Sequence, residues 1–430
     1  MRYASTSATN TINKMADIER IYDLFGECSG VTTDSRNVSE GSLFVALRGA
    51  SFDGNKFVCA ALDRGAKYAI ADSDEPLAER ADLTERIIRV EDSLATLQAL
   101  AREHRRRLTL PIIGIVGSNG KTTTKELVSR VLAEKFEVYA TRGNLNNHIG
   151  VPLTLLAMTR DTEFGVVEMG ASACGEIALL ASIAEPNYGL ITNIGRAHLE
   201  GFGGEDGVRR GKGELFDFLS ENGGHAFIPE EDATLMSMAE ERTNLAVEHY
   251  SRTVADGVKS NLEGEYNRAN IAAAIAVGRY FDIPQERIAD AITSYIPENN
   301  RSQRVTTDRN TLIVDCYNAN PSSMAAAIEN MRNESGKHKL LILGDMLELG
   351  EWSGQEHRLA LEDALSIDGI EIFTVGGHFR EAAHTTAADV KCFDSTEALS
   401  QYLKINTLTG RTILLKGSRG IALEKIIEKL

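Results

Sequence analysis

The feature that most constrains the fold is a glycine-rich turn between an apolar run and a helix-forming stretch. The residues of 112–116 are Ile-Ile-Gly-Ile-Val, which predicts a buried strand. The turn Gly117-Ser-Asn-Gly120-Lys121-Thr122-Thr123 follows, and then a helical pattern over 123–135. A strand, a glycine turn and a helix in this order aim backbone N–H groups and the positive helix end at an anion. The sequence therefore predicts a phosphate-binding loop within a parallel α/β sheet.

This loop is shorter than the common GxxxxGK[ST] pattern, because residue 115 is Ile where that pattern has Gly. Lys121 is suited to neutralise the β- and γ-phosphates, and the Thr122 hydroxyl can ligate Mg²⁺. The alternative is a tight glycine turn that binds nothing. A phosphate loop alone also does not separate an ATP-driven ligase from a nucleotide switch or a motor.

The length and the alternation of strands and helices predict three α/β domains. At about 150 residues per domain, 430 residues make about three. Strands that alternate with helices indicate mostly parallel sheets. We expect a disordered extension over residues 1–14, a small α/β domain over 15–107, a central parallel-sheet domain over 108–301 and a doubly wound, Rossmann-like domain over 302–430.

The composition excludes several classes of protein. Lys and Arg total 46 against 62 Asp and Glu, a formal charge of −16, which argues against a protein that coats nucleic acid or enters an anionic membrane. An anion must therefore be bound by a local site. The five cysteines are dispersed singly, as in a reducing compartment, and no apolar run is long enough to span a membrane. We expect a cytoplasmic protein.

Two further side chains follow predicted strands of the central region. Glu168 ends the run Val166-Val-Glu168, and His198 follows Ile191-Thr-Asn-Ile-Gly-Arg-Ala. The carboxyl ends of parallel strands meet at one edge, so Thr122, Glu168 and His198 can share one site. Taken singly, Glu168 is equally a solvated carboxylate, and His198 a core or surface histidine.

From about Met15 onward, the sequence resembles the Mur ligases of bacterial cell-wall synthesis. The resemblance is carried by the phosphate loop and by Gly143-Asn-Leu-Asn146-Asn147, Glu168-Met-Gly-Ala, Ala197-His198-Leu-Glu-Gly-Phe and Gly211-Lys212-Gly-Glu214. In the third region, Asp315-Cys-Tyr317-Asn318-Ala-Asn320-Pro321, Gly344-Asp345-Met346-Leu-Glu348 and Lys416-Gly-Ser418-Arg419 are similar to signatures of the family branch that adds D-alanyl-D-alanine.

The resemblance implies a role for each matching residue. The implied catalytic residues are Lys121, Glu168, His198 and Lys212. ATP is held by Gly117, Ser118, Asn119, Gly120, Lys121, Thr122, Thr123, Asn267, Asn270, Arg301, Asp315 and Asn318. Two Mg²⁺ are ligated by Thr122, Glu168, His198 and Lys212, and the Lys212 amine carries a carbamate formed from CO₂. The UDP-sugar and its peptide contact Thr33, Asp34, Ser35, Arg36, Asp53, Gly54, Asn55, Asn146 and Asn147. The dipeptide side comprises Tyr317, Asn320, Asp345, Lys416, Ser418 and Arg419.

The implied reaction is ATP-dependent amide formation between UDP-N-acetylmuramoyl tripeptide and D-alanyl-D-alanine, through an acyl phosphate and a tetrahedral intermediate. The placement of the motifs suggests that the third domain closes during catalysis, and we expect a monomer. The alternatives are a sister Mur ligase, a folylpolyglutamate synthase and a nucleotide-binding regulatory module without catalysis. The sequence leaves open whether the third peptide residue is diaminopimelate or lysine, and whether translation begins at Met1 or Met15.

Overall fold

The computed structural model describes residues 17–430 except 263, 265, 298–300, 336–337 and 387–389. The chain divides into two compact units. The first contains the chain up to Thr109 together with residues 148–159, and the second contains Leu110–Asn147 and Arg160–Leu430. The extension predicted over residues 1–14 lies outside the described residues.

The first unit is built on a parallel four-stranded sheet of order β1-β2-β3-β4. Apolar side chains from the sheet and from α2 form its core, which includes Phe44, Val58 and Leu62. The strands are β1 (Val31–Thr32), β2 (Leu43–Val45), β3 (Tyr68–Ala71) and β4 (Ile87–Arg89), and the helices are α1 (Ile18–Phe25), α2 (Val58–Asp63), α3 (Glu75–Glu79) and α4 (Ser93–Leu108).

A later segment of the chain completes this unit. Helix α6 (Gly150–Leu156) packs on α4. Nε2 of the buried His104 lies 2.9 Å from the carbonyl oxygen of Met158, and its Nδ1 lies 3.0 Å from the Tyr22 hydroxyl. The sequence did not predict that residues 148–159 join the first unit, because a short apolar helix gives no signal of the surface it covers.

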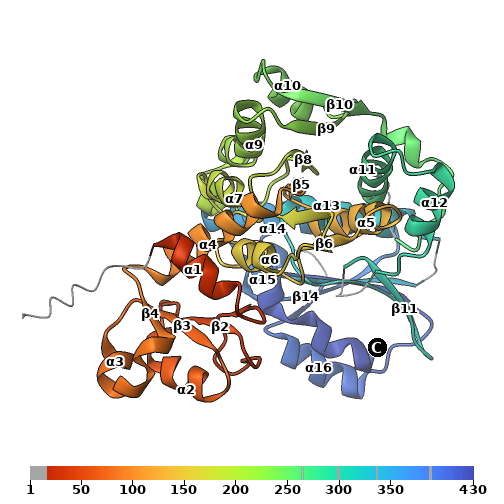
Figure 1. The fold of residues 1–430 in the computed structure, drawn as a ribbon. Coiled ribbons are helices and arrows are strands. Elements are labelled where there is room, and N and C mark those ends of the chain that lie inside the picture. The colour runs from red at the N-terminus through yellow and green to blue at the C-terminus, as the bar shows by residue number, and fades with distance from the viewer. Residues whose placement is uncertain (1–16, 263, 265, 298–300, 336–337, 387–389) are drawn as a thin grey trace, which may run out of the picture. The chain divides into compact units, whose positions relative to one another are not determined.

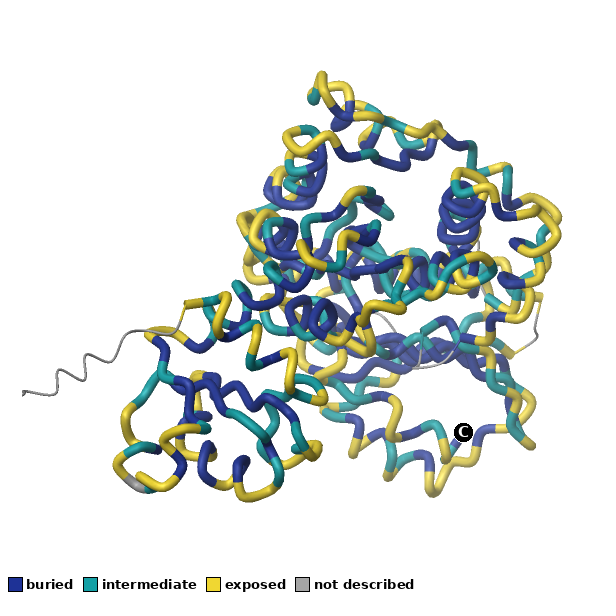
Figure 2. The backbone as a smooth tube through the Cα atoms, in the orientation of Figure 1, coloured by how far each residue is buried: buried dark blue, intermediate teal, exposed yellow. Residues whose placement is uncertain are grey.

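The second unit begins with a six-stranded sheet of order β10-β9-β8-β5-β7-β6, in which every pair is parallel. The strands are β5 (Ile112–Val116), β6 (Val138–Ala140), β7 (Phe164–Glu168), β8 (Tyr188–Ile191), β9 (His225–Pro229) and β10 (Ala246–Tyr250). Strands β5 and β7 are buried along their whole length (Figure 2). Because β5 lies between β7 and β8, their carboxyl ends are neighbours.

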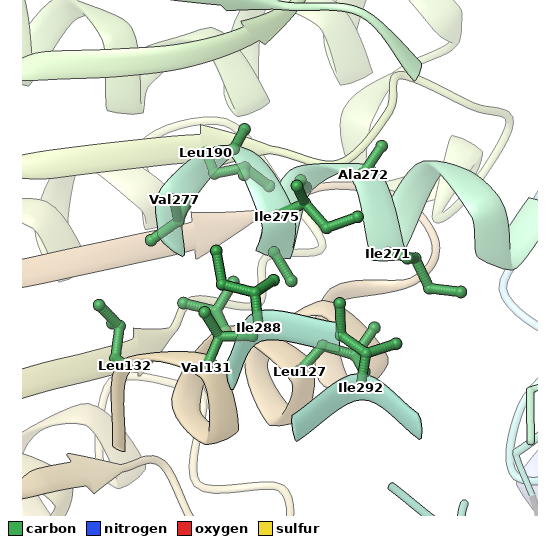
Figure 3. Packing of buried hydrophobic residues seen from close by; sticks show 14 of the residues in the cluster. Leu127, Val131, Leu132, Leu190, Ile271, Ala272, Ile275, Val277, Ile288 and Ile292 are labelled. Carbon is green, nitrogen blue, oxygen red and sulfur yellow. The ribbon is translucent and has the colours of Figure 1, made fainter. Parts of the chain in front are cut away.

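Helices cover this sheet on both faces (Figure 1). Apolar side chains of α5, α11 and α12 meet over β8, as Figure 3 shows for Leu127, Ile275 and Ile288. Burying each of these side chains stabilises the fold by about 1.5–3 kcal/mol. The helices are α5 (Lys121–Ala133), α7 (Glu176–Ala184), α8 (Leu199–Phe202), α9 (Glu205–Glu221), α10 (Ala233–Glu240), α11 (Tyr266–Tyr280) and α12 (Gln285–Thr293).

The remainder of the second unit forms a mixed sheet of order β11-β12-β16-β13-β14-β15. Only the β11–β12 pair is antiparallel among the described pairs. The strands are β11 (Gln303–Thr306), β12 (Thr311–Asp315), β13 (Lys339–Gly344), β14 (Glu371–Val375), β15 (Lys391–Phe393) and β16 (Thr412–Lys416), and the helices are α13 (Pro321–Asn333), α14 (Ser353–Leu365), α15 (Gly377–Thr386) and α16 (Thr396–Ile405).

The predicted α/β class with parallel sheets is confirmed. The sequence analysis missed β1, β4, β9, β10, β11 and β15 among the strands. β11 alternates intermediate and exposed residues and β10 is mostly exposed, so neither carries the apolar run that identified the buried strands. Within the described residues, no helix is both long and apolar enough to span a membrane.

Candidate active site

The predicted phosphate loop joins β5 to α5 through two glycines with positive φ. Gly117 has φ +144° and Gly120 has φ +78°, and both conformations favour glycine. A Cβ on Gly117 would lie 1.9 Å from Thr192 Oγ1, and one on Gly120 would lie 2.5 Å from Asn270 Oδ1. The loop therefore needs glycine at both positions for conformation and for space.

The segment after β8 braces this loop. Ser118 Oγ donates to the Gly195 carbonyl at 2.9 Å, and Gly195 N–H donates back to Ser118 Oγ at 3.0 Å. Asn119 N–H donates to Asn193 Oδ1 at 3.2 Å, and Thr192 Oγ1 donates to the Asn119 carbonyl at 2.5 Å. Thr192, Asn193 and Gly195 are functional residues that the sequence analysis quoted within a motif without giving them a role.

Lys121 begins α5 and lies between groups of opposite charge. Its Nζ donates to the carbonyl oxygen of Gly117 at 2.7 Å. Burial lowers the pKa of Lys121 below its ordinary value, the charge of Glu168 acts against that shift, and Arg301 adds to it. Lys121, Glu168 and Arg301 thus lie close enough to influence one another, as an anion site at this loop requires.

Glu168 ends β7 and is only 2% exposed. Its backbone N–H donates to Thr141 Oγ1 at 3.0 Å, and its Oε1 accepts from Asn146 Nδ2 at 2.7 Å. Its Oε2 is buried and has no hydrogen-bond partner among the described residues. A buried carboxylate oxygen without a donor is costly unless a cation or another donor joins it. The oxygen is thus suited to a metal ion.

Lys212 lies in the middle of α9 and is 1% exposed. Its Nζ donates to the carbonyl oxygen of Ala171 at 2.9 Å and lies 4.8 Å from the centre of the Phe202 ring. Burial and, second, the charge of Lys121 lower the pKa of Lys212 to about 7. A large fraction of this amine is therefore neutral near pH 7.

His198 is turned toward the C-terminal sheet. It has φ +52°, and its Nδ1 lies 2.5 Å from Glu348 Oε2. Nowhere in the described part of the chain do three His, Cys, Asp or Glu side chains meet in a cluster that could hold a metal ion. That Glu168 and His198 ligate Mg²⁺ therefore stays a prediction.

Two buried asparagines of α11 lie next to the phosphate loop. Asn270 Oδ1 accepts from Thr124 Oγ1 at 3.1 Å, and its Nδ2 donates to Asn267 Oδ1 at 2.8 Å. Asn267 and Asn270 are 1% and 5% exposed. They tie α11 to α5 beside Gly120, and whether they also contact adenine stays a prediction.

At the end of β12, the predicted nucleotide residues form a bonded cluster with Lys416. Lys416 Nζ donates to Asp315 Oδ2 at 2.7 Å and to the Asn318 carbonyl at 3.0 Å. The Arg301 guanidinium carbon lies 3.8 Å from the centre of the Tyr317 ring, and Arg419 Nη1 donates to the Tyr317 hydroxyl at 3.2 Å. Tyr317 thus lies against two arginines.

The other residues predicted on the dipeptide side all have hydrogen-bond partners within the protein, and their contact with the dipeptide stays a prediction. The Asp345 carboxylate accepts from the backbone N–H groups of His378 at 3.0 Å and Phe379 at 2.9 Å, at the start of α15. Ser418 Oγ accepts from Leu347 N–H at 2.9 Å. Asn320 caps α13 and donates from Nδ2 to Asn119 Oδ1 at 2.8 Å, which brings it to the phosphate loop.

The predicted UDP-sugar residues lie in the first unit, apart from Asn146 and Asn147, which belong to the second. Asn55 is 2% exposed, and its Nδ2 donates to Asp53 Oδ1 and Asp72 Oδ1, each at 2.7 Å. Asp34 forms an exposed ion pair with Arg36 at 2.8 Å, and the guanidinium of Arg36 lowers the pKa of Asp34 to about 2. Thr33 and Ser35 flank Asp34, and Gly54 follows Asp53.

The fold and the phosphate loop define a family. Three family models match the chain in order: "Mur ligase family, catalytic domain" over residues 27–105, "Mur ligase middle domain" over 115–257 and "Mur ligase, glutamate ligase domain" over 300–419. The chain therefore belongs to the Mur ligase family, which confirms the resemblance seen in the sequence.

Particular relatives carry a more specific name. The UDP-N-acetylmuramoyl-tripeptide–D-alanyl-D-alanine ligase of Bacillus subtilis is 36% identical, and the match covers 93% of each chain. The enzyme of the same name from Escherichia coli is 31% identical over 98% of each chain. Among solved structures, MurF of Acinetobacter baumannii gives a TM-score of 0.82 at 28% identity, covering 93% of this chain and 92% of that one. MurF of Thermotoga maritima in complex with ADP gives 0.79 at 27% identity, covering 95% and 97%.

Proposed function

We propose that the chain is an ATP-dependent ligase that joins D-alanyl-D-alanine to the terminal carboxylate of UDP-N-acetylmuramoyl tripeptide, in the synthesis of peptidoglycan precursors. One observation carries the proposal: relatives of this name match across more than nine tenths of both chains. The phosphate loop with Lys121, in the fold of a solved relative that holds ADP, supports the use of ATP.

The reaction needs an activated carboxylate. A peptide carboxylate attacks the γ-phosphorus of ATP, ADP leaves, and an acyl phosphate results. The neutral dipeptide amine then attacks the acyl carbon, and the tetrahedral intermediate expels phosphate as the amide forms, while the amine proton passes to water. Lys121 and the N–H groups at the start of α5 stabilise the negative charge of the transferred phosphoryl group and hold it in line with the carboxylate.

We propose that Mg²⁺ accompanies the nucleotide. The buried Glu168 Oε2 lacks a hydrogen-bond partner in the described part of the chain, and a carboxylate oxygen fits this hard cation. Thr122 and Glu168 would hold one ion, with His198 and a modified Lys212 serving a second. When bound, the ions neutralise charge on the phosphate oxygens. Asn146 orients Glu168 through its hydrogen bond to Oε1.

We propose that Lys212 carries a carbamate. Only a neutral amine attacks CO₂: the N–C bond forms and a proton passes to water. An ordinary lysine at pH 7 is neutral in well under about 0.1% of molecules, whereas burial and Lys121 lower the pKa of Lys212 to about 7. The product is an anion, which removes the repulsion between Lys212 and Lys121.

The other predicted contacts remain proposals. Arg301 lies close enough to Lys121 to lower its pKa and is suited to the nucleotide phosphates, with Asp315 and Asn318 on the same side. Tyr317 and Arg419 offer an aromatic face and a cation to the dipeptide, whose own carboxylate needs a positive partner. We assign the UDP-sugar to the first unit. We also propose that the enzyme acts as a monomer in the cytoplasm, where ATP is made.

The decisive experiment measures phosphate release by the purified chain with ATP, Mg²⁺, UDP-N-acetylmuramoyl tripeptide and D-alanyl-D-alanine. Release should require both acceptor and dipeptide, and mass spectrometry should find the pentapeptide product. Tripeptides ending in diaminopimelate and in lysine are tested in parallel, because they identify the preferred third residue. ATP turnover without either substrate would contradict the proposal.

The carbamate is tested separately. Lys212→Ala should abolish turnover while the affinity for ATP stays close to that of the unmodified chain. Near-normal rates in this variant would discard the carbamate. Reaction with ¹³C-labelled CO₂ gives a second readout, since a carbamate carbon has its own NMR resonance in the unmodified chain and should be missing from the variant.

A further inference from the structure

Within the second unit, the segment after β8 contacts the C-terminal sheet region through an ion pair. Arg196 Nη1 lies 2.7 Å from Glu356 Oε1, near the start of α14. The Arg196 backbone N–H donates to Ser322 Oγ at 2.8 Å, at the start of α13. A Cβ on Gly195 would lie 2.8 Å from the same oxygen. Arg196 is therefore held by its backbone as well as by its side chain.

Glu356 depends on this contact because it is buried. Its side chain is 5% exposed, against 39% for Arg196. Burial raises the pKa of Glu356, and the charge of Arg196 acts against that shift. Removing one partner of a buried pair leaves the other charge uncompensated, which is strongly unfavourable. The pair is thus a specific link and not a surface contact of little effect.

The residue next to Glu356 holds a second contact in place. His357 is fully buried; its Nδ1–H donates to the Ser353 carbonyl at 2.7 Å, and its Nε2 accepts from Met346 N–H at 2.9 Å. The loop that begins at Met346 carries Glu348, whose Oε2 lies 2.5 Å from His198 Nδ1. The first turn of α14 therefore reaches Arg196 directly and His198 through this loop.

The same central segment braces the phosphate loop. Gly195 exchanges two hydrogen bonds with Ser118, and Asn193 binds Asn119. Only Ile194 and Gly195 lie between Asn193 and Arg196 in the sequence. A continuous set of short contacts thus runs from the phosphate loop through residues 193–196 to α14.

We propose that Arg196 and Glu356 are positioning residues: their ion pair docks α14 onto the segment that braces the phosphate loop, and so fixes where the dipeptide amine meets the activated carboxylate. Neither residue touches the reacting atoms in this assignment. The inference rests on the proposed function, since it names the residues that set the geometry of its second step.

The chain contains a built-in probe of this docking. Its single tryptophan, Trp352, lies in sequence between the loop that begins at Met346 and helix α14. A Cβ built on Gly204, just before α9, would lie 3.8 Å from its ring. Loss of docking would expose this ring to water and shift its fluorescence to longer wavelength. The readout does not depend on catalysis.

The experiment compares Glu356→Gln, Arg196→Glu and the charge-swapped double variant Arg196→Glu/Glu356→Arg. Asp363→Asn is the matched control, because Asp363 lies on the same helix and pairs at 2.7 Å with Arg332 of α13 instead.

We expect Glu356→Gln to lower kcat/KM for the dipeptide at least about tenfold, a change of about 1.4 kcal/mol, with ATP affinity within about twofold. The fluorescence of Trp352 should shift to longer wavelength. The double variant should recover activity and emission relative to Arg196→Glu, and the control should match the unmodified chain.

Two outcomes would overturn the inference. One is a Glu356→Gln variant whose dipeptide kinetics and Trp352 emission are unchanged. The other is a charge-swapped double variant that is no more active than Arg196→Glu and has the same Trp352 emission. If the unmodified chain forms no pentapeptide, the proposed function fails instead, and the emission of the single and double variants still decides whether the pair docks α14.

Discussion

The phosphate loop and the ends of the C-terminal strands were both predicted as binding regions, and the structure shows that they differ in kind. At the phosphate loop, Glu168 Oε2 has no hydrogen-bond partner within the described residues, and Lys121 is bonded through Nζ to backbone carbonyls. At the C-terminal strand ends, Asp345 binds two backbone N–H groups and Lys416 binds Asp315. The first region leaves a carboxylate oxygen without a donor, while in the second region the carboxylates of Asp345 and Asp315 are both bonded to neighbouring groups.

The difference teaches that a sequence signature mixes ligand-binding residues with residues that shape the site. Asp345 is 4% exposed, and a Cβ on Gly376 would lie 2.3 Å from its carboxylate. Such a residue is fixed by the fold around it. Substitutions should therefore reduce activity at the first region without loss of stability, and reduce stability at the second.

The largest effect is expected from Lys121→Ala. Loss of the positive charge beside the γ-phosphate should lower kcat by about 10²–10³ or more, while the free energy of unfolding changes little. Phosphate release and thermal unfolding measure the two quantities. Lys425→Ala is the control, because Lys425 is exposed and pairs only at 3.4 Å with Glu397. Equal losses in both variants would remove the distinction between the regions.

Glu168→Gln should lower kcat by about 10² without destabilising the fold. The amide keeps an oxygen for the Asn146 hydrogen bond, and the buried charge without a hydrogen-bond donor is gone. We expect the free energy of unfolding to stay equal or to rise, as measured by chemical denaturation, and the dependence of turnover on Mg²⁺ concentration to weaken. A marked loss of stability would show that Glu168 belongs with the structural carboxylates.

Asp345→Asn, in contrast to Glu168→Gln, should lower the stability of the fold. Only one amide oxygen remains to accept from the N–H groups of His378 and Phe379, so the free energy of unfolding should fall by about 1–3 kcal/mol. The exposed Asp368→Asn is the comparison, with an expected change below about 0.5 kcal/mol. If Asp345→Asn keeps full stability and raises only the KM for the dipeptide, Asp345 binds ligand after all.

The most gradual effect concerns Lys212 and pH. The folded chain holds this amine at a pKa of about 7, below its ordinary value of 10.5. Between these values the unfolded chain binds a proton that the folded chain lacks, so the Lys212 contribution to stability increases with pH, by up to about 1.4 kcal/mol per unit. In CO₂-free buffer from pH 7 to 9, the unfolding free energy of the unmodified chain should rise relative to Lys212→Met. Parallel curves would contradict the lowered pKa.

Much of the fold could be read from the sequence because buried strands and glycine turns have strong local signals. The strand over 112–116 and the glycines at 117 and 120 have the predicted structure, and their chemistry is local. The adjacency of Glu168 to the loop also followed from the geometry of parallel strands: in the β5–β7 register, Ile115 pairs with Glu168.

What the sequence did not show are contacts between distant segments. Nothing near Arg196 indicates that its partner is Glu356, 160 positions later, and nothing in the sequence around His357 shows that this histidine is fully buried. The side-chain amide of Asn193 holds the phosphate loop, yet it looks like an ordinary loop residue. Such pairings depend on how the elements pack, which periodicity does not encode.

The late entry of residues 148–159 into the first unit bears on synthesis of the chain. A ribosome finishes α4 at Leu108, but the carbonyl of Met158 that faces His104 is made fifty residues later. Until then the side of α4 that packs on α6 is exposed to solvent. The nascent first unit therefore cannot complete its folding while β5, the phosphate loop and β6 are synthesised. A fragment ending at Thr109 should therefore aggregate or attract chaperones, whereas the two segments joined by a short linker should fold.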